Sequence, residues 1–566
     1  MSRASAALLA ALALTAANAL KPLVIDDAVY VAFAQQAAQH PGDPYGFEFY
    51  WYAAPEPAMR IGTVPAVLPY WLALAMTLFG DHPVAWKLSL FPFALALTGS
   101  LAFLLRRCAP SIAAPVLFAI ALGPTLLPGL NLMLDVPAVA LGLLGYALCV
   151  LACERRDGRI ALASGLALAL AMQTKYSAVV YPALALVHAA SERRPREGAV
   201  ALLAAAGLFV GWEALLVARY QQSHLLAGLE RLRSIEVLPT LIQAEAEMPG
   251  SAALYWTLCL LSLLGGTLLL PGLLAWVGLG ATRRSVGCAA LAAGAGFAAI
   301  AVLPRPPVFG GEGFFGRLAA YNPELFVFVP LGACVALAVG AAAAGSLRRG
   351  TAGERRLDRV LVAWLALELV GYYAISPYPA VRRVIGLGIA ATLLGARAAA
   401  RRKDAPDARA GVRIAVALGL ALGLLYFGSD LADARARREL VARAERRLAE
   451  LGADRERENL WFIGHWELQF YAERAGMRQV VAGESQLRPQ DWVLLPAVAP
   501  RAPVALPASY FRREDELIAT SAAPWSTISA YYDGPVPLRR QPESQEKLWI
   551  LRVVRALVPQ LQGTQR

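Results

Sequence analysis

Long apolar stretches alternate with short polar stretches along the first 428 residues of the chain. A helix that crosses a membrane needs about 20 consecutive apolar residues, and most of these stretches reach or approach that length. We therefore predict a polytopic α-helical membrane protein with about 13 transmembrane helices. The predicted spans are residues 5–24, 84–105, 111–130, 136–152, 160–174, 177–190, 198–217, 253–280, 286–303, 323–345, 358–375, 380–398 and 411–428.

Clusters of arginine between these stretches set the predicted orientation. Lys and Arg collect in loops on the cytoplasmic side of a membrane. With thirteen spans, the loop 25–83 and everything after residue 428 face outward. The apolar stretch 64–80 would reverse every later loop if it crossed, so we expect a helix on the outer membrane surface there. The basic clusters that then share the cytoplasmic side lie at 104–107, 154–159, 192–197, 282–284, 347–359 and 397–413.

The pattern changes after residue 428. Residues 430–458 are rich in Arg, Glu and Ala, which predicts a charged helix that begins at Ser429 or Asp430 as its N-cap. Short runs of β-branched and aromatic residues then predict strands, with a helix at 465–476 between the first two. We expect a transmembrane domain over 1–428 and an extracytoplasmic α/β domain over 429–566. The predicted strands are 460–464, 478–481, 491–496 and 547–554.

Composition supports the membrane class. The 566 residues are 58% hydrophobic and only 17% charged, which is more apolar surface than a soluble protein of this size can bury. The net charge of +12 comes from basic clusters between apolar runs, so it does not indicate nucleic-acid binding. The six cysteines lie within or beside apolar runs and predict neither a disulfide framework nor a zinc site.

Two adjacent carboxylates, Asp26 and Asp27, follow the first predicted span. Ionisable groups at a membrane boundary are costly, so those that persist are candidates for function. One alternative is that an Asp caps the helix predicted to follow. A cap needs one carboxylate, however, and here there are two.

Further charges are predicted at the same outer face. Asp135 lies at the outer end of the third span, where capping of the next helix is the alternative role. Lys175 is a lone cation between two apolar segments, and a snorkelling lysine is the alternative there. Arg382 and Arg383 lie outside against the charge rule, which is unfavourable unless an anion holds them. Carboxylates and cations together suit transfer from a lipid-linked phosphate, with a carboxylate as proton acceptor and cations on the departing phosphate.

The order of several motifs resembles a known family. They are "IDDAVY" after the first span, "DPYGF" and "PYWLALAMTLFG" in the first outer loop, "LMLDVP" and "TKYSAVVYP". Together they resemble the GT-C glycosyltransferases of the protein O-mannosyltransferase and ArnT-like group, glycosyltransferase family 39. "PYPAVRR" and "GHWELQFYAERAG" resemble ArnT-like members more loosely. The resemblance implies the GT-C fold and an inverting transfer of a sugar from a polyprenyl-phosphate donor.

The resemblance also implies roles for individual residues. Asp26 matches the first acid of the family's acidic pair, the catalytic base, and Asp27 matches the second. Asp135 matches an acid that holds the acceptor or the sugar, and Lys175 matches a lysine that contacts phosphate. ArnT-like proteins commonly carry "KPPL" before the surface helix, whereas this chain has "TVPAVLPYW". Arg60, or the pair Arg382 and Arg383, would then supply the missing charge, and the donor could differ.

The remaining predictions concern partners and alternatives. His224 and Glu213 are candidates to contact the acceptor, with loop hydrogen bonding and helix packing as their alternatives. The histidines lack the paired spacing of a metal site, no cofactor is expected, and a need for a divalent metal stays open. Lipid, protein and glycan acceptors are all compatible with the sequence, and the predicted location is the bacterial cytoplasmic membrane. A transporter or lipid flippase is the main alternative, but the chain shows no duplicated halves.

Overall fold

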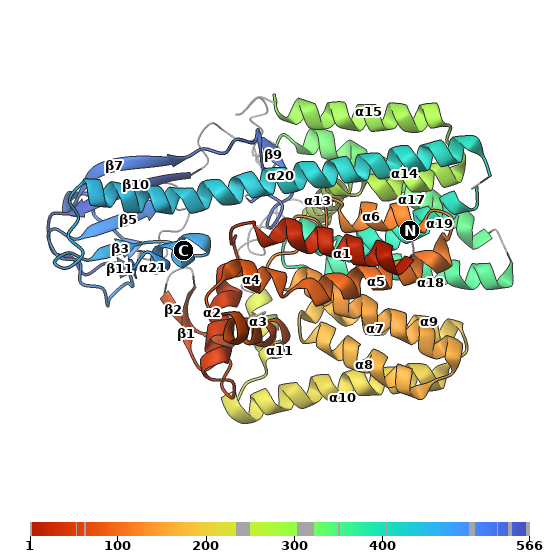
Figure 1. Ribbon diagram of the computed structural model, residues 1–566, viewed down its shortest axis with the longest axis horizontal. Helices are drawn as coiled ribbons and strands as arrows, with labels where there is room; N and C mark the ends of the chain where they lie inside the picture. Colours follow the sequence, from red (N-terminus) through yellow and green to blue (C-terminus); the bar gives the residue numbers. More distant parts are fainter. Residues whose placement is uncertain are drawn as a thin grey trace.

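The computed structural model consists of a helical body and a smaller sheet region, joined by one long helix, α20 (Pro406–Glu450). Figure 1 shows the sheet at one end of the long axis and the helices filling the rest. The structure describes residues 3–51, 54–61, 64–233, 250–302, 318, 322–348, 351–402, 404–496, 504–528, 530–540 and 546–561.

Helices make up nearly all of the body. The first group of helices is α1 (Arg3–Ala19), α2 (Asp27–Gln39), α3 (Val67–Phe79), α4 (Pro83–Leu88), α5 (Phe91–Cys108) and α6 (Ala113–Ala121). The next group is α7 (Asp135–Arg155), α8 (Gly158–Met172), α9 (Val180–Ser191), α10 (Pro195–Tyr220) and α11 (His224–Arg233). The last group is α13 (Ser251–Thr267), α14 (Leu269–Leu279), α15 (Arg283–Ile300), α17 (Leu325–Arg348), α18 (Ala352–Ile375) and α19 (Ile385–Ala400).

Every predicted span contains a helix, although residue 303 at the end of one span lies outside the described residues. In the described part, five helices are long and apolar enough to cross a membrane. The pair α13 and α14 counts as a sixth span if its 80° bend is one broken crossing, and several further apolar helices are shorter. The structure thus supports a multi-pass membrane protein, while the count of thirteen crossings stays a prediction.

The predicted span 111–130 differs most from the structure. Its helix α6 has nine residues and ends at Ala121, and residues 122–134 form turns and bends. The sequence "GPTLLPGL" explains the break, because proline lacks an N–H and glycine favours turns. Broken backbone is tolerated at membrane depth only when protein groups satisfy it. Here Asn18, Lys21 and Tyr531 donate hydrogen bonds to carbonyl oxygens of this segment, at 2.6 to 3.0 Å.

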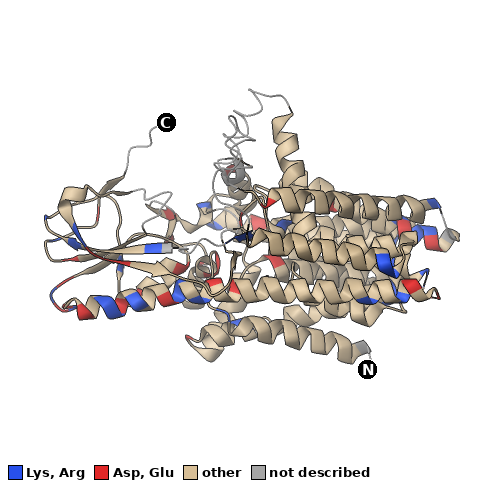
Figure 2. Cartoon of the chain, turned by 90° about the horizontal axis from the view of Figure 1, so that it is seen from above, with Lys and Arg blue, Asp and Glu red and all other residues tan. Residues whose placement is uncertain are grey.

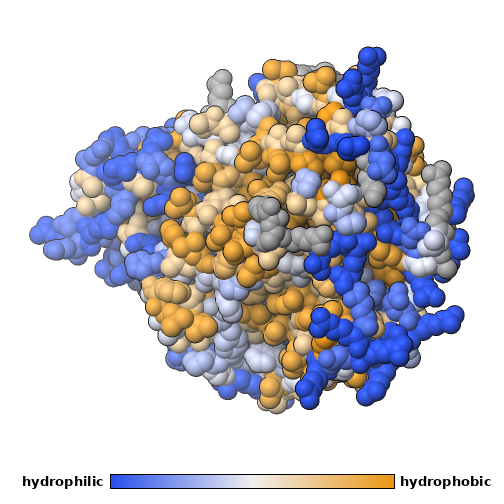
Figure 3. Space-filling model, turned by 45° about the vertical axis from the view of Figure 1, so that its right-hand side comes forward, coloured by the Kyte–Doolittle hydropathy of each residue, from blue (hydrophilic) through white to orange (hydrophobic). Residues whose placement is uncertain are grey.

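An apolar band covers the face of the helical body that Figure 3 shows. Figure 2 shows helices that are tan over most of their length, with charged residues gathered toward both ends of the long axis. Figure 3 shows orange surface between hydrophilic surface over the sheet region and hydrophilic surface at the opposite end. The surface helix predicted at 64–80 is α3, whose 13 residues span about 20 Å, too short for a hydrocarbon core of about 30 Å.

The main sheet contains the four predicted strands and one that was not predicted. Five strands lie in the order β4-β3-β5-β10-β7, in which β3 is parallel to β4 and β5, and β10 is antiparallel to β5 and β7. Strand β7 was not predicted because five of its nine residues are charged, a pattern that suits a solvated edge strand. The bounds are β3 (Leu460–Phe462), β4 (Arg478–Gln479), β5 (Trp492–Pro496), β7 (Phe511–Ala519) and β10 (Glu546–Val553), with helix α21 (Glu467–Arg474) as predicted.

The body and the sheet region are closely joined. The prediction that a helix begins at Ser429 or Asp430 is wrong, because α20 runs without a break from Pro406 to Glu450. The proposed boundary at 428/429 therefore falls inside one helix. The chain also returns from the sheet to the body, where the Val381 N–H donates to the carbonyl oxygen of Tyr531 at 3.1 Å.

The predicted orientation can be tested with reporter fusions. Alkaline phosphatase needs disulfides that form only outside the cytoplasm. We expect it to be active when fused after Gly452 and inactive when fused after Gly158, between α7 and α8. A cytoplasmic fluorescent reporter at the same two positions should give the opposite pattern. Phosphatase activity at Gly158, or its absence at Gly452 in a fusion of normal abundance, would overturn the orientation.

Candidate active site

Four charged side chains that are distant in the sequence form one connected row. Arg382 Nη1 lies 2.7 Å from Asp26 Oδ2 and 3.8 Å from Asp135 Oδ2. Lys175 Nζ donates a hydrogen bond to the other oxygen of Asp135. These residues come from the start of α2, the 3-10 helix Val381–Arg383, the start of α7 and the residue before the 3-10 helix Tyr176–Val179. The structure thus brings together the carboxylates and cations that the sequence placed at one face.

Helix capping does not account for these carboxylates. Asp26 is the N-cap residue of α2 but has helical backbone angles, and its side chain makes no capping hydrogen bond. Asp135 is the first residue of α7, and the N-cap residue before it, Leu134, has no side chain that could cap. Both carboxylates instead face cations from other elements. The alternative role considered for Asp26 and Asp135 is therefore not what the structure shows.

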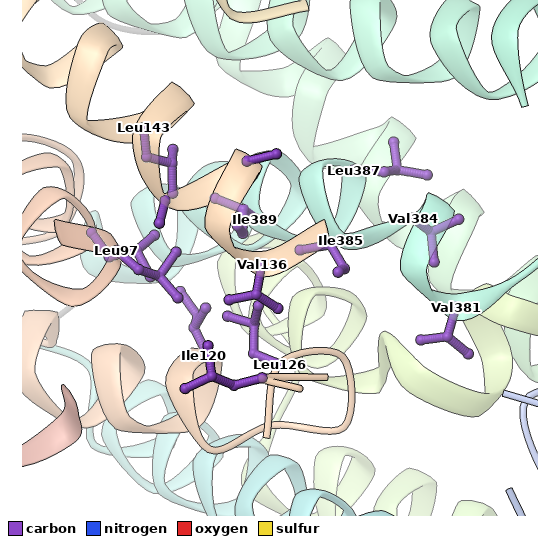
Figure 4. Close-up of a cluster of buried hydrophobic side chains, with 14 of the residues drawn as sticks. Leu97, Ile120, Leu126, Val136, Leu143, Val381, Val384, Ile385, Leu387 and Ile389 are labelled. Atoms are coloured by element: carbon purple, nitrogen blue, oxygen red, sulfur yellow. The ribbon is translucent and has the colours of Figure 1, made fainter. Parts of the chain in front are cut away.

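A buried apolar cluster holds the row in place from behind. Figure 4 shows Val136, next to Asp135, packed among Leu97, Ile120, Leu126 and Leu143. Val381 and Val384, which flank the two arginines, lie with Ile385 in the same cluster. Interiors packed in this way leave little room for displacement. The backbone positions from which the charged side chains extend are therefore fixed.

The two adjacent aspartates have different surroundings. Asp27 is fully buried; its Oδ2 accepts a hydrogen bond from Val24 N–H at 3.0 Å and lies 3.8 Å from Lys87 Nζ. Burial raises the pKa of the Asp27 carboxyl to about 6, and the Lys87 ammonium opposes that rise. The Asp26 side chain is 18% exposed. Asp26 is consequently the member of the pair that an external molecule can reach.

The residue before this pair has an unusual backbone conformation. Ile25 has φ +44°, in the left-handed region, where a β-branched residue is rare. Such a conformation costs on the order of 1–3 kcal/mol and persists only where the surroundings impose it. Glu467 of helix α21 accepts a hydrogen bond from the Ile25 N–H at 3.0 Å. Neither Ile25 nor Glu467 was singled out from the sequence, because nothing local in either segment indicates the contact.

A cavity opens beside the row of charges. It has a volume of about 70 Å³ and lies between α7, α9, α18 and α19. Its charged lining comes from Asp135, Lys175, Arg382, Arg383 and Glu368. Glu368 lies inside the predicted span 358–375, and its Oε1 accepts a hydrogen bond from Trp364 Nε1 at 3.0 Å. The remaining lining is mostly apolar and includes Ala138, Val139, Tyr181, Tyr372 and Ile375.

The two neighbouring arginines differ in what holds them. From the sequence, we expected an anion to hold both arginines. For Arg382 the anions are carboxylates of the protein itself, Asp26 and Asp135. Arg383 lies over the ring of Tyr378, 4.9 Å from its centroid, and forms no ion pair within the described residues. Arg383 is thus the cation of this site that is available to a negatively charged ligand.

His224 and Glu213 form a separate network behind Lys175. Tyr176 Oη donates to Glu213 Oε1 at 3.0 Å and lies 2.6 Å from His224 Nδ1. His224 is fully buried, and burial lowers its pKa to about 4, so its ring is neutral at pH 7. The network fixes Tyr176, the neighbour of Lys175. Contact of His224 or Glu213 with an acceptor stays a prediction.

Two other predicted features lie apart from this site. Arg60 is exposed at the end of the 3-10 helix Ala58–Arg60 and does not line the cavity, so its contact with a donor stays a prediction. Throughout the ranges that the structure describes, no group of three or more His, Cys, Asp or Glu side chains is placed to hold a metal ion.

No protein-family profile and no curated protein sequence matches the chain. The oligosaccharyltransferase AglB of Archaeoglobus fulgidus, in complex with an inhibitory peptide and a dolichol-phosphate, is 12% identical with a TM-score of 0.47, over 87% of this chain and 69% of AglB. ArnT of Cupriavidus metallidurans bound to undecaprenyl phosphate is 14% identical with a TM-score of 0.36, over 96% of each chain. Both are GT-C glycosyltransferases, the class that the sequence motifs resemble. These sequence identities and TM-scores are low, so they carry no argument about the function of this chain.

The ionisation of Lys175 gives a testable pH dependence. Burial, and next the Arg383 guanidinium, lower the pKa of Lys175 to about 7. Lys175 is therefore mostly cationic below pH 7 and mostly neutral above it. A polyprenyl-phosphate sugar is a phosphodiester with one negative charge between pH 6 and pH 8.5. The affinity of the protein for this phosphodiester should therefore fall about 10-fold from pH 6 to pH 8.5.

The matched control is Lys175→Arg, because arginine stays charged at these pH values. Its affinity for the same phosphodiester should be nearly independent of pH over this range, as measured by titration of the purified protein in detergent. An equal pH dependence in the Lys175→Arg protein would show that Lys175 is not the titrating group.

Proposed function

We propose that the protein is a membrane glycosyltransferase. It transfers a sugar from a polyprenyl-phosphate-linked donor to an acceptor at the outer side of the cytoplasmic membrane, with inversion at the anomeric carbon. The observation that carries this proposal is the row Asp26, Arg382, Asp135 and Lys175, which runs beside a cavity lined by cations. A base for the acceptor and cations for a leaving phosphate are then present in one site.

Asp26 is the proton acceptor in this mechanism. An uncharged hydroxyl attacks an anomeric carbon poorly, and a positioned base makes it a better nucleophile. As the acceptor oxygen bonds to the anomeric carbon, the bond from that carbon to the phosphate oxygen breaks and the acceptor proton passes to Asp26. Arg382 Nη1 donates a hydrogen bond to Asp26 Oδ2 at 2.7 Å and fixes the direction of the carboxylate. One displacement of this kind inverts the anomeric configuration.

The cations stabilise the leaving group. The phosphodiester donor becomes a phosphomonoester, so negative charge develops on the departing oxygen during the reaction. Preorganised cations near a developing charge are among the strongest sources of catalysis in a site that excludes water. Arg383 and Lys175 line the cavity and serve this purpose, while Arg382 is shared with the two carboxylates.

The position of the site suits a donor with a lipid tail. The cavity is lined by the first residues of α7 and α19, both apolar helices, and by the last residues of α18. A polyprenyl chain can then stay in the membrane while its phosphate reaches Arg383 and Lys175. The same residues fit lipid, protein and glycan acceptors, and hexosyl and pentosyl donors.

Replacing Asp26 tests the proposed base. Asp26→Asn keeps the size of the side chain and removes the base, so transfer should fall 100- to 10,000-fold. The measurement uses membranes of a deletion strain that produces each variant in matched amounts. It follows the incorporation of labelled sugar from synthetic polyprenyl-phosphate hexoses and pentoses. Asp27→Asn should have a smaller effect on turnover and a larger one on stability, because Asp27 is fully buried.

The outcomes separate the alternatives. Near-normal transfer by Asp26→Asn together with complete loss in Asp27→Asn would reverse the assignment within the pair. Normal transfer by both variants would remove the basis of the enzyme proposal and favour the transporter alternative. Movement of an unchanged lipid across vesicle membranes, without any new glycosidic bond, would identify such a transporter directly.

Replacing Arg383 tests the phosphate site. A hydrogen bond to a charged group contributes roughly 1.5–3 kcal/mol, so Arg383→Ala should weaken binding of polyprenyl phosphate about 10- to 100-fold. Polyprenyl phosphate is the common product whatever the sugar, which makes it a suitable probe. Arg60→Ala is the matched control and should bind it normally. Equal affinity of the Arg383→Ala and unaltered proteins would exclude the proposed phosphate contact, and a defect confined to Arg60→Ala would move that contact to the exposed arginine.

A further inference from the structure

The sheet region contacts the loop that carries Asp26. Glu467, the first residue of α21, is 6% exposed, and its Oε2 accepts a hydrogen bond from the Ile25 N–H at 3.0 Å. Four residues later on the same helix, the Tyr471 hydroxyl accepts a hydrogen bond from the Leu23 N–H at 2.9 Å. Two backbone groups just before Asp26 are therefore bonded to side chains from a part of the chain more than 400 residues away.

Glu467 is itself held in position. Its second oxygen, Oε1, accepts a hydrogen bond from Arg437 of α20. The residue before it, Trp466, has φ +60°, so the backbone on this side of the contact is also in the left-handed region. Arg437 balances the charge of the buried carboxylate and leaves Oε2 directed at the Ile25 N–H. A charged acceptor of this kind makes a stronger hydrogen bond than a neutral one.

The contact acts on the strained residue. Ile25, at φ +44°, would be more favourable in an extended or right-handed helical conformation. A change in its backbone angles would redirect the Ile25 N–H away from Glu467 and would move the next residue, Asp26. Residues in such conformations at functional sites persist because the surroundings over-determine them. Glu467 is the surrounding group that bonds directly to this residue.

We propose that Glu467 is a positioning residue for the reaction, which holds Ile25 in its left-handed conformation and thereby sets the Asp26 carboxylate. This inference rests on the proposed role of Asp26 as the base. The sheet region then does more than cover the membrane part, because it supplies a residue without which the base is misplaced. Displacement of a catalytic group by about 1 Å can cost on the order of 100-fold in rate.

The test combines removal of Glu467 with relief of the strain at Ile25. Glu467→Ala should lower the maximal rate of transfer about 10- to 100-fold and change the donor KM less than 3-fold. Glycine adopts positive φ without steric cost, so Ile25→Gly in the Glu467→Ala background should restore much of the lost rate. The rescue is measured relative to Ile25→Gly alone, which gives the effect of removing the buried Ile25 side chain. The assay is the membrane incorporation of labelled sugar from synthetic polyprenyl-phosphate hexoses and pentoses, with protein amounts matched.

Glu473→Ala is the matched control, because this exposed acid on the same helix bonds to Gln469 and does not reach the loop. It should transfer sugar normally. A Glu467→Ala rate equal to that of Glu473→Ala would overturn the proposal. A loss in Glu467→Ala that Ile25→Gly does not repair would also overturn it, since a merely structural role predicts no rescue by glycine. Failure of the base assignment is recognised separately, by normal transfer in the Asp26→Asn protein.

Discussion

A buried ion pair between Lys21 and Asp430 fixes the C-terminal end of the first helix to the long helix α20. The two charged atoms are 2.6 Å apart, and both side chains are fully buried. Burying two charges is costly, and removing one partner of such a pair destabilises a protein by roughly 3–5 kcal/mol. Lys21 Nζ also donates to the Pro128 carbonyl at 2.6 Å, in the broken segment after α6. Three parts of the chain thus meet at one ammonium group.

The loop that carries the aspartate pair is defined by this pair and by its neighbour. Lys87 Nζ donates to the carbonyl oxygens of Lys21 and Pro22, at 2.8 and 3.2 Å, and lies 3.8 Å from Asp27. Each buried lysine therefore satisfies backbone oxygens as well as a carboxylate. This arrangement leaves Asp27 occupied with holding the loop, whereas Asp26 pairs with Arg382, which lines the cavity. Asp26 and Asp27 thus differ because each faces a different cation, Arg382 for Asp26 and Lys87 for Asp27.

The features that the sequence predicted are those with local or compositional signals. Charges that persist at the outer boundary identified Asp26, Asp135, Lys175 and Arg382 as partners in one site. Hydrophobic periodicity located the helices, and strand β5 followed from its apolar run. In contrast, no rule of spacing indicates that Glu467 bonds to Ile25 or that Asp430 pairs with Lys21, because these partners are 442 and 409 residues apart. The charged strand β7 was hidden for a different reason, since its pairing with β10 outweighs its weak strand propensity.

The long separation of these partners has a consequence for biosynthesis. Lys21 is made early, whereas Asp430 and Tyr532, whose oxygens surround its ammonium group, follow 409 and 511 residues later. At about 5–20 residues per second, the ribosome needs on the order of tens of seconds to reach them. During that time the nascent chain carries an unpaired lysine at the end of its first helix and has no Glu467 to hold Ile25. The contacts that hold Lys21 and Ile25 are therefore completed only late in translation.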